Sequence, residues 1–251
     1  MTLSVRGKVV SPSNHVPVIL IHGAANSAIV WTLWQEELAR GGWSSYALDL
    51  RAHGDSGDAD LAHTSMADYA ADVIACAREF RKPPLLMGWS MGGLVSLMAA
   101  DTVGAVACVG LAPSTPARSN NPTTKPRIGE FGPEEYGIVD RDPALQPTMP
   151  DLDIEERRIA LGSLGKESRF ARDERSAGIV ISKLSSPCLI VTGTADEYWP
   201  RSRYQDFPLE ADFIDVNGAS HWGLVLSRRA LRTLVPTVLE WVDRTLRRRA
   251  Q

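Results

Sequence analysis

A pentapeptide with a single serine between two glycines, Gly88-Trp89-Ser90-Met91-Gly92, carries the clearest chemical signal in the chain. It follows an apolar run at 84–87, expected to be a strand, and precedes a run of small residues expected to be a helix. A strand, a tight turn and a helix in this order would expose the Ser90 hydroxyl at the tip of the turn. The two glycines avoid side-chain clashes where strand and helix approach closely. The free N–H groups at the helix N-terminus would stabilise an oxyanion beside that hydroxyl.

A serine hydroxyl is a weak nucleophile at neutral pH, so it needs a base, a group that orients the base and an oxyanion site. His221 lies in a loop after the last expected strand, at the sheet end that would also hold Ser90, and is the expected base. Asp196 follows the preceding strand and is the expected orienting carboxylate. Glu197 is the adjacent alternative, whereas Asp215 lies inside an expected strand and is a weaker candidate.

The other four histidines have less specific settings. His22 directly follows the apolar run 16–21, and we expect it to hold the loop 23–25 in shape. His53 lies in a polar loop, and His15 and His63 lie in polar segments that look exposed. No histidine pair has metal-ligand spacing, so we expect no metal and no other cofactor.

Composition narrows the class of protein. The chain has 251 residues, of which 44% are hydrophobic and 23% charged, which suits one large soluble α/β domain or two small ones. A net charge of −3 gives no electrostatic case for nucleic acid or an anionic membrane. The segment 162–168 superficially resembles a phosphate-binding loop, but its spacing is wrong and no strand precedes it. The expected partner is a small-molecule substrate, and the oligomeric state is open.

The three cysteines are expected to be buried, free thiols. Cys76, Cys108 and Cys188 lie in apolar patterns, which is consistent with a reducing compartment. Residues 1–10 lack the charged start and apolar core of a signal peptide. The longest apolar stretch, 92–113, is interrupted by Asp101 and Gly104 and does not suit a membrane span. We therefore expect a cytoplasmic protein.

Apolar runs with the length of strands alternate with runs that have a helical pattern. This alternation predicts an α/β fold with a mostly parallel sheet and helices on both faces. Strands are expected over 3–10, 16–21, 45–50, 84–89, 105–111, 187–191 and 212–216. Helices are expected around 31–38 and over 66–80, 91–100, 153–161, 167–177, 201–207 and 224–246.

The alternation of strand-like and helix-like runs is interrupted at Pro113. Eight of the sixteen prolines lie between Pro113 and Pro150, with few apolar residues to build sheet strands. We interpret 113–183 as an inserted cap with too little apolar content to fold alone. The core domain would comprise 1–112 and 184–251.

The motifs together resemble those of α/β-hydrolase fold serine hydrolases, and the match covers nearly the whole chain outside the cap. His22-Gly23 followed by Trp31 is similar to the family's oxyanion loop. The segment 49–56 is similar to its loop after the next strand, with Ala52 where glycine is usual. The segment 193–200 is similar to its acid-bearing loop.

The resemblance also implies the order and the oxyanion site. The family's elbow architecture places nucleophile, acid and base in the chain order Ser90, Asp196, His221. The resemblance further implies an oxyanion hole built from the backbone N–H groups of Ala24 and Met91. The departure at Ala52 affects only the local geometry of its loop.

These residues predict an esterase-type serine hydrolase that acts on a small carboxylic ester or related acyl compound through an acyl-enzyme. Thioester, lactone and carbon–carbon bond cleavage stay open. So does a non-hydrolytic use of the same fold, as a small-molecule receptor or a lyase. A serine at position 90 argues against the branches that resemble haloalkane dehalogenases and epoxide hydrolases, which need a carboxylate there.

Three tryptophans are candidates for the pocket wall, with plain packing as the alternative. Trp89 precedes Ser90, Trp222 follows His221, and Trp199 lies in the acid-bearing loop. Bulky side chains close to the nucleophile would crowd long acyl chains. We therefore expect highest turnover for acetyl- to butyryl-sized esters and no activation at a lipid interface.

Overall fold

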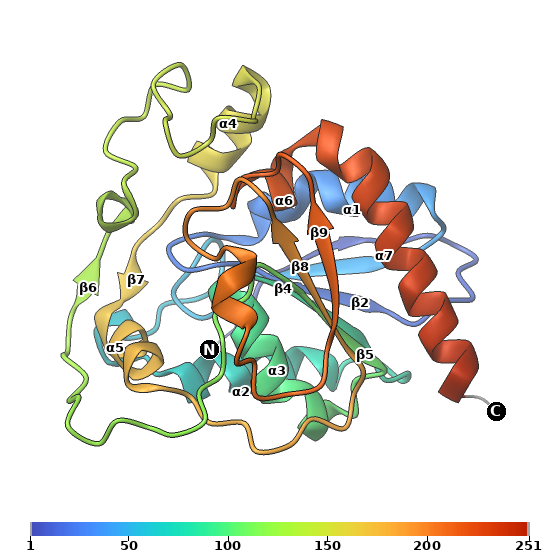
Figure 1. The fold of residues 1–251 in the computed structure, drawn as a ribbon, viewed down its shortest axis with the longest axis horizontal. Coiled ribbons are helices and arrows are strands. Elements are labelled where there is room, and N and C mark those ends of the chain that lie inside the picture. The colour runs from blue at the N-terminus through green and yellow to red at the C-terminus, as the bar shows by residue number, and fades with distance from the viewer. Residues whose placement is uncertain (1, 250–251) are drawn as a thin grey trace.

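A seven-stranded sheet forms the centre of the molecule (Figure 1). The computed structural model describes residues 2–249. The strand order is β1-β3-β2-β4-β5-β8-β9, and every neighbouring pair is parallel except the edge pair β1 and β3. The mostly parallel sheet predicted from the sequence is thus confirmed. The strands are β1 (Val5–Lys8), β2 (Val18–Ile21), β3 (Ser45–Leu48), β4 (Leu85–Trp89), β5 (Ala107–Leu111), β8 (Cys188–Gly193) and β9 (Asp212–Val216).

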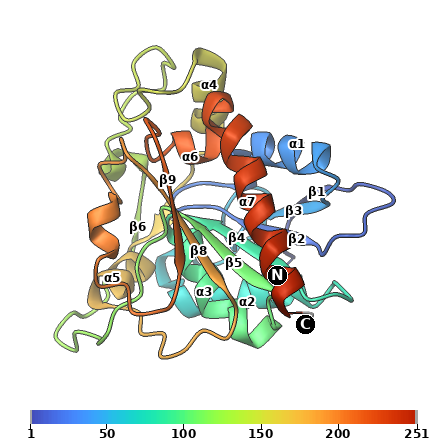
Figure 2. The same cartoon turned by 45° about the vertical axis from the view of Figure 1, so that its right-hand side comes forward.

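Helices cover both faces of the sheet, as expected (Figure 2). Successive residues of a strand point to opposite faces of the sheet, so the continuous apolar run of β2 contributes side chains to two hydrophobic cores, one on each face. Val18 and Leu20 pack in a cluster with α1, α6 and α7, whereas Ile19 and Ile21 pack with α2 and α3. The helices are α1 (Thr32–Arg40), α2 (Met66–Ala77), α3 (Met91–Val103), α6 (Gly223–Leu226) and α7 (Arg228–Arg249).

The single terminal helix expected over 224–246 is wrong, because two helices occupy this part of the chain. Ser227 separates α6 from α7 with an extended backbone, at ψ 107°. Its hydroxyl accepts a hydrogen bond from the Ala230 N–H at 3.4 Å, which caps the start of α7. The hydrophobic periodicity of the sequence continues across Ser227 and does not reveal the break. The capping role of this serine is the feature that marks it.

The segment between β5 and β8 contributes no strand to the central sheet. It holds a two-stranded ribbon of β6 (Glu130–Phe131) and β7 (Glu167–Ser168), with α4 (Ile154–Gly162) and α5 (Arg169–Ala177). The expected helix 167–177 therefore starts at Arg169, because its first two residues form β7. Apolar side chains of this segment, including Ile138, Met149 and Leu152, join the core cluster that contains α1 and α7. The remaining short helices are η1 (Ala28–Trp31), η2 (Leu61–His63), η3 (Pro133–Tyr136) and η4 (Arg201–Tyr204).

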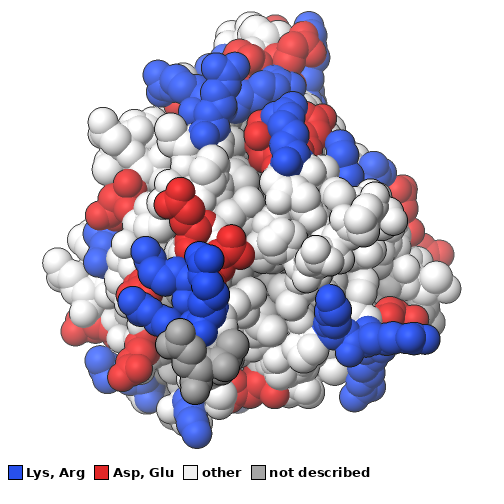
Figure 3. Space-filling view, turned by 90° about the vertical axis from the view of Figure 1, so that its right-hand side faces the viewer, with Lys and Arg blue, Asp and Glu red and all other residues white. Residues whose placement is uncertain are grey.

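The three cysteines match the sequence-based expectation. All three thiols are free and buried, as predicted, and burial raises the pKa of Cys76 and Cys188 to about 12. On the face shown in Figure 3, groups of basic side chains lie beside acidic ones. Across residues 2–249, no helix is both long and apolar enough to span a bilayer.

Candidate active site

Ser90 occupies a sharp turn between β4 and α3. Its backbone angles, φ 54° and ψ −119°, are strained for a residue with a side chain. A Cβ on Gly88 would come within 2.1 Å of the Gly92 carbonyl oxygen, and one on Gly92 within 2.2 Å of the Ile21 carbonyl oxygen. The predicted reason for both glycines, close approach of strand and helix, is therefore confirmed.

His221 and Asp196 form a buried hydrogen-bonded pair. The ring Nδ1–H of His221 donates to Oδ2 of Asp196 at 2.7 Å. Oδ1 of Asp196 accepts hydrogen bonds from the backbone N–H groups of Tyr198 and Trp199, at 2.8 and 2.9 Å. Burial alone would raise the pKa of Asp196, but the hydrogen bond and charge of His221, with these two N–H groups, outweigh burial and lower it. The carboxylate is thus held ionised and aimed at the ring.

The two alternative carboxylates do not contact this ring. Glu197 is exposed to solvent. Asp215 lies on β9, where it accepts a hydrogen bond from Thr192 and lies 3.6 Å from Arg201. Among the acidic residues considered from the sequence, the structure brings only Asp196 to His221.

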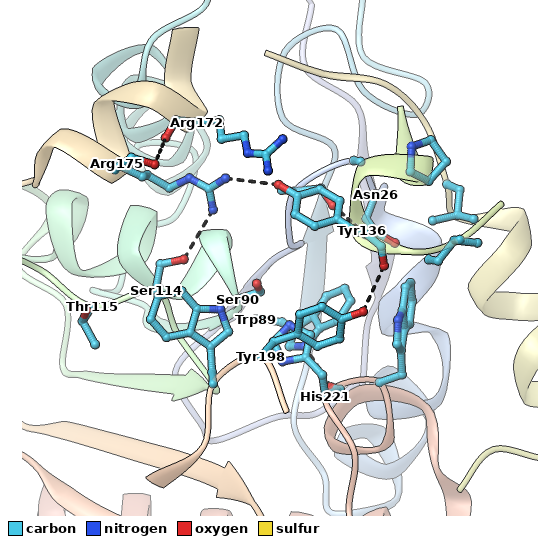
Figure 4. Close-up of a pocket in the computed structure, with 18 of the residues that line it drawn as sticks. Asn26, Trp89, Ser90, Ser114, Thr115, Tyr136, Arg172, Arg175, Tyr198 and His221 are labelled. Atoms are coloured by element: carbon cyan, nitrogen blue, oxygen red, sulfur yellow. Dashed lines mark hydrogen bonds between the residues drawn. The ribbon is translucent and has the colours of Figure 1, made fainter. Parts of the chain in front are cut away.

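Ser90 and His221 open into one cavity of about 380 Å³ (Figure 4). The Trp89 indole N–H donates to the His221 carbonyl at 3.1 Å. This hydrogen bond holds the loop that carries His221 against the turn that carries Ser90. Trp222 packs on Trp89 with ring centroids 4.8 Å apart. Among residues 2–249, no hydrogen bond joins the Ser90 hydroxyl to His221. All three tryptophans considered from the sequence, Trp199 included, line the cavity.

The expected oxyanion donors lie at the same end of the sheet. Ala24 lines the cavity, and no acceptor for its backbone N–H is present in the described part of the chain. Met91 is the first residue of α3, so its N–H has no acceptor within the helix. Its side chain is fully buried in the core with α2 and does not line the cavity. Met91 could therefore contribute to an oxyanion site only through its backbone N–H.

His22 holds the neighbouring loops in place, as expected from its position. The Leu50 N–H donates to Nε2 of His22 at 3.1 Å, so Nδ1 carries the proton and donates to the Gly23 carbonyl at 2.8 Å. Burial, reinforced by the charge of His53, lowers the pKa of His22 to about 4. The ring is neutral at pH 7 and acts as a structural hydrogen-bonding group.

A buried cluster around Glu167 was not anticipated from the sequence. The carboxylate of Glu167 accepts hydrogen bonds from the Tyr69 hydroxyl at 2.6 Å and from the Ala25 N–H at 3.0 Å. His53 Nε2 lies 3.5 Å from the same carboxylate, an ion-pair distance without a hydrogen bond. Burial would raise the pKa of Glu167, but the interaction with His53 and the hydrogen bond from Tyr69 outweigh burial and lower the pKa to about 2.

The His53 side chain is buried, although it belongs to a polar loop. Burial would lower the pKa of His53, but the Glu167 carboxylate outweighs burial and raises it. His15 stacks on Trp43 with centroids 4.0 Å apart, and His63 lies exposed, 2.6 Å from Asp60. Neither of these two contacts the cavity. Within residues 2–249, no group of histidine, cysteine and acidic side chains is arranged to hold a metal.

Three arginines also line the cavity, and no sequence pattern pointed to them. Arg172 and Arg175 project from α5, and Arg203 from η4, whereas none of the described lining residues is acidic. Arg172 pairs with Glu135. Two of the three arginines, Arg172 and Arg175, therefore belong to the inserted segment.

Comparison with known proteins connects this geometry to a family. Residues 18–233 match the family model of the alpha/beta hydrolase family. The monoacylglycerol lipase of Paleococcus ferrophilus is similar, with a TM-score of 0.71 and 20% identity over 98% of this chain and 100% of that chain. A thermophilic esterase from Thermogutta terrifontis has a TM-score of 0.70 and 18% identity, over 96% of this chain and 93% of that chain. A variant of tomato methylketone synthase I has a TM-score of 0.71 and 18% identity, over 94% of this chain and 100% of that chain. The comparison with curated proteins finds no match.

Proposed function

Because this chain belongs to the alpha/beta hydrolase family, we propose that it is a serine hydrolase that cleaves small carboxylic esters. One observation carries the proposal. A strained serine at a strand-to-helix turn and a histidine held by a buried carboxylate open into the same cavity. Strain of this kind persists only where the surrounding structure enforces it, and it is concentrated at functional sites.

In the proposed reaction, Ser90 attacks the ester carbonyl while His221 Nε2 takes the hydroxyl proton. Asp196 keeps the proton on Nδ1 and stabilises the imidazolium that forms. The backbone N–H groups of Ala24 and Met91 stabilise the negative oxygen of the tetrahedral intermediate. His221 then gives its proton to the departing alcohol, and an acyl-enzyme ester remains on Ser90. Water, deprotonated by the same ring, hydrolyses that ester and releases the acid.

We assign substrate selection to the inserted segment 113–183. Tyr136, Leu164 and Arg175 of this segment form part of the cavity wall, opposite the triad loops. The Tyr198 hydroxyl, in the acid-bearing loop, donates to the Tyr136 carbonyl at 2.9 Å and bridges core and inserted segment. The limited cavity volume and its tryptophan walls support compact acyl groups. Three free, buried cysteines support a cytoplasmic location.

A fluorophosphonate probe tests the proposal directly, since it forms a stable adduct only with an activated serine. We expect a single adduct on the peptide that contains Ser90, and hydrolysis of p-nitrophenyl butyrate that the probe abolishes. Ser90→Ala should prevent the adduct, whereas Ser176→Ala, which removes another hydroxyl from the cavity wall, should not. Absence of both adduct and turnover on esters, thioesters and lactones would contradict the proposal and favour a receptor or lyase.

A further inference from the structure

The cavity contains one guanidinium whose hydrogen-bonding capacity is largely unused. Nη1 of Arg175 lies 3.4 Å from the Ser114 hydroxyl and Nη2 lies 3.3 Å from the Tyr136 hydroxyl, both long contacts (Figure 4). Its Nε is buried without a hydrogen-bond partner. A buried donor without an acceptor is costly, so this donor set favours a ligand that supplies one.

No carboxylate within residues 2–249 forms an ion pair with Arg175. The other two arginines of the cavity differ in this respect. Arg172 pairs with Glu135 and lies over the Phe131 ring, 4.8 Å from its centroid. Arg203 is exposed and lies over Trp199, 5.1 Å from the ring centroid. Arg175 is therefore the cation in the cavity that has neither an acidic partner nor full access to solvent.

The buried carboxylate of Glu167 interacts with the charge of Arg175 but does not occupy its donors. The positive charge of Arg175 contributes to the lowered pKa of the Glu167 carboxyl. However, the Glu167 oxygens already accept hydrogen bonds from Tyr69, Ala25 and the Ser168 N–H, at 2.6, 3.0 and 2.7 Å. Glu167 thus balances part of the charge at a distance and leaves the guanidinium free to bind an anion.

Ser114 links Arg175 to the residue proposed as the nucleophile. The Ser114 N–H donates to the Ser90 carbonyl oxygen at 2.9 Å, and the Ser114 hydroxyl is the group that Arg175 contacts. An anionic group on the guanidinium would therefore lie a short distance from a carbonyl carbon presented to Ser90. We therefore expect a short spacer between the two groups.

We infer that the enzyme prefers esters carrying a carboxylate a few carbons from the scissile bond, and that Arg175 binds this carboxylate. The inference rests on the function proposed above. A guanidinium presents two parallel N–H groups that match a planar carboxylate, with the hydroxyls of Ser114 and Tyr136 beside them. One unpaired guanidinium balances the single charge of a carboxylate better than the charge of −1.5 to −2, roughly, of a phosphate monoester.

Matched ester pairs test the inference. Monomethyl glutarate and dimethyl glutarate share chain and leaving group and differ in the charged end. We expect kcat/KM to be about 10-fold or more higher for the monoester. Arg175→Met should lower the monoester-to-diester ratio of kcat/KM by about 10- to 100-fold, and Arg175→Lys by less, since it keeps the charge without the fork. Arg244→Met, which removes an exposed charge from α7, should leave this ratio within about 3-fold.

Inhibition by free anions identifies the anion class. Glutarate should inhibit hydrolysis of p-nitrophenyl butyrate competitively in the wild type and only weakly in Arg175→Met. Equal inhibition by inorganic phosphate would overturn the carboxylate assignment. A diester hydrolysed as fast as the monoester would overturn the inference, as would an equal loss of preference in Arg203→Met.

Binding to an inactive protein separates the two proposals. Calorimetry with Ser90→Ala should detect binding of monomethyl glutarate, and binding should be lost when Arg175→Met is added. Binding with this dependence supports the anion site even if the wild type hydrolyses no ester, which would count against the proposed function alone. Ester hydrolysis without such binding contradicts the anion site alone. Thermal unfolding of each variant, with Arg175→Lys as the milder change, shows that the comparison is made on folded protein.

Discussion

The Glu167 carboxylate accepts a hydrogen bond from the Ala25 backbone N–H at 3.0 Å, across 142 positions of the chain. Ala25 follows Ala24, whose N–H is one of the two proposed oxyanion donors, and Ala25 has a left-handed backbone, φ 56°. The inserted segment therefore fixes the shape of the oxyanion loop through a charged and fully buried group. In this way the segment to which we assign substrate selection would also support the proposed catalytic geometry.

Glu167→Gln should remove a specific pH dependence of stability. The pKa of Glu167 is lowered, so its contribution is present above pH 4.5, roughly, and is lost as pH falls toward about 2. The pKa of His53 is raised, so its contribution is present below pH 6.5, roughly, and is lost as pH rises through the folded-state value. The difference in unfolding free energy between wild type and Glu167→Gln should therefore be largest near pH 5.5, roughly.

Urea unfolding at about pH 5.5 and about pH 9 measures this difference. We expect the wild type to lose more stability than Glu167→Gln between the two values. Burial is the main cause of the lowered pKa of His22, and this burial is present in both proteins. Parallel losses in the two proteins would show that the buried pair contributes no titrating interaction.

Asp196→Asn should cripple turnover without unfolding the chain. An amide cannot fix the His221 tautomer as the carboxylate does, so we expect kcat to fall by about 10⁴-fold. Glu197→Gln is the matched control, because it makes the same chemical change at the exposed neighbouring position. A benign Asp196→Asn together with a crippling Glu197→Gln would mean that the wrong acid has been assigned.

Ala52→Gly should stabilise the fold. Ala52 has φ 58°, in the left-handed region that costs a residue with a Cβ about 1 kcal/mol, and this is the position where the family resemblance leads one to expect glycine. We expect a gain of up to about 1 kcal/mol, reduced by the larger entropy of an unfolded glycine. Ala71→Gly, at an exposed position inside α2, should instead cost about 1 kcal/mol. Equal destabilisation by both substitutions in thermal unfolding would contradict this account.

Acyl length should limit turnover. A cavity of about 380 Å³ walled by Trp89, Trp199 and Trp222 leaves room for compact groups. We expect kcat/KM on p-nitrophenyl esters to peak between acetyl and butyryl, with no jump above the micelle threshold. A peak at long chains, or interfacial activation, would contradict the claim that the cavity accepts only compact acyl groups. The triad assignment would be unaffected.

Much of the sheet and of the site could be predicted from the sequence. Strands β2, β4 and β5 are buried on both faces, so each appears as an unbroken apolar run. Ser90, Asp196 and His221 each follow a parallel strand, and the carboxyl ends of parallel strands share one edge of the sheet. Their convergence thus follows from chain order and strand direction.

Glu167 and Arg175 could not be found in this way. Both lie in the inserted segment, where neither hydrophobic period nor strand order fixes which way a side chain points. Their contacts, to Ala25 and Ser114, join residues 142 and 61 positions apart. Tertiary packing alone creates these contacts, so no local pattern records them.

The most direct test of the account is the steady-state rate of Ser90→Ala on p-nitrophenyl butyrate. Removing the hydroxyl abolishes the acyl-enzyme and leaves only binding and oxyanion stabilisation. We predict a fall in kcat of about 10⁴-fold or more, with an unchanged circular dichroism spectrum. Near-normal turnover by folded Ser90→Ala would contradict the central claim that this serine is the nucleophile.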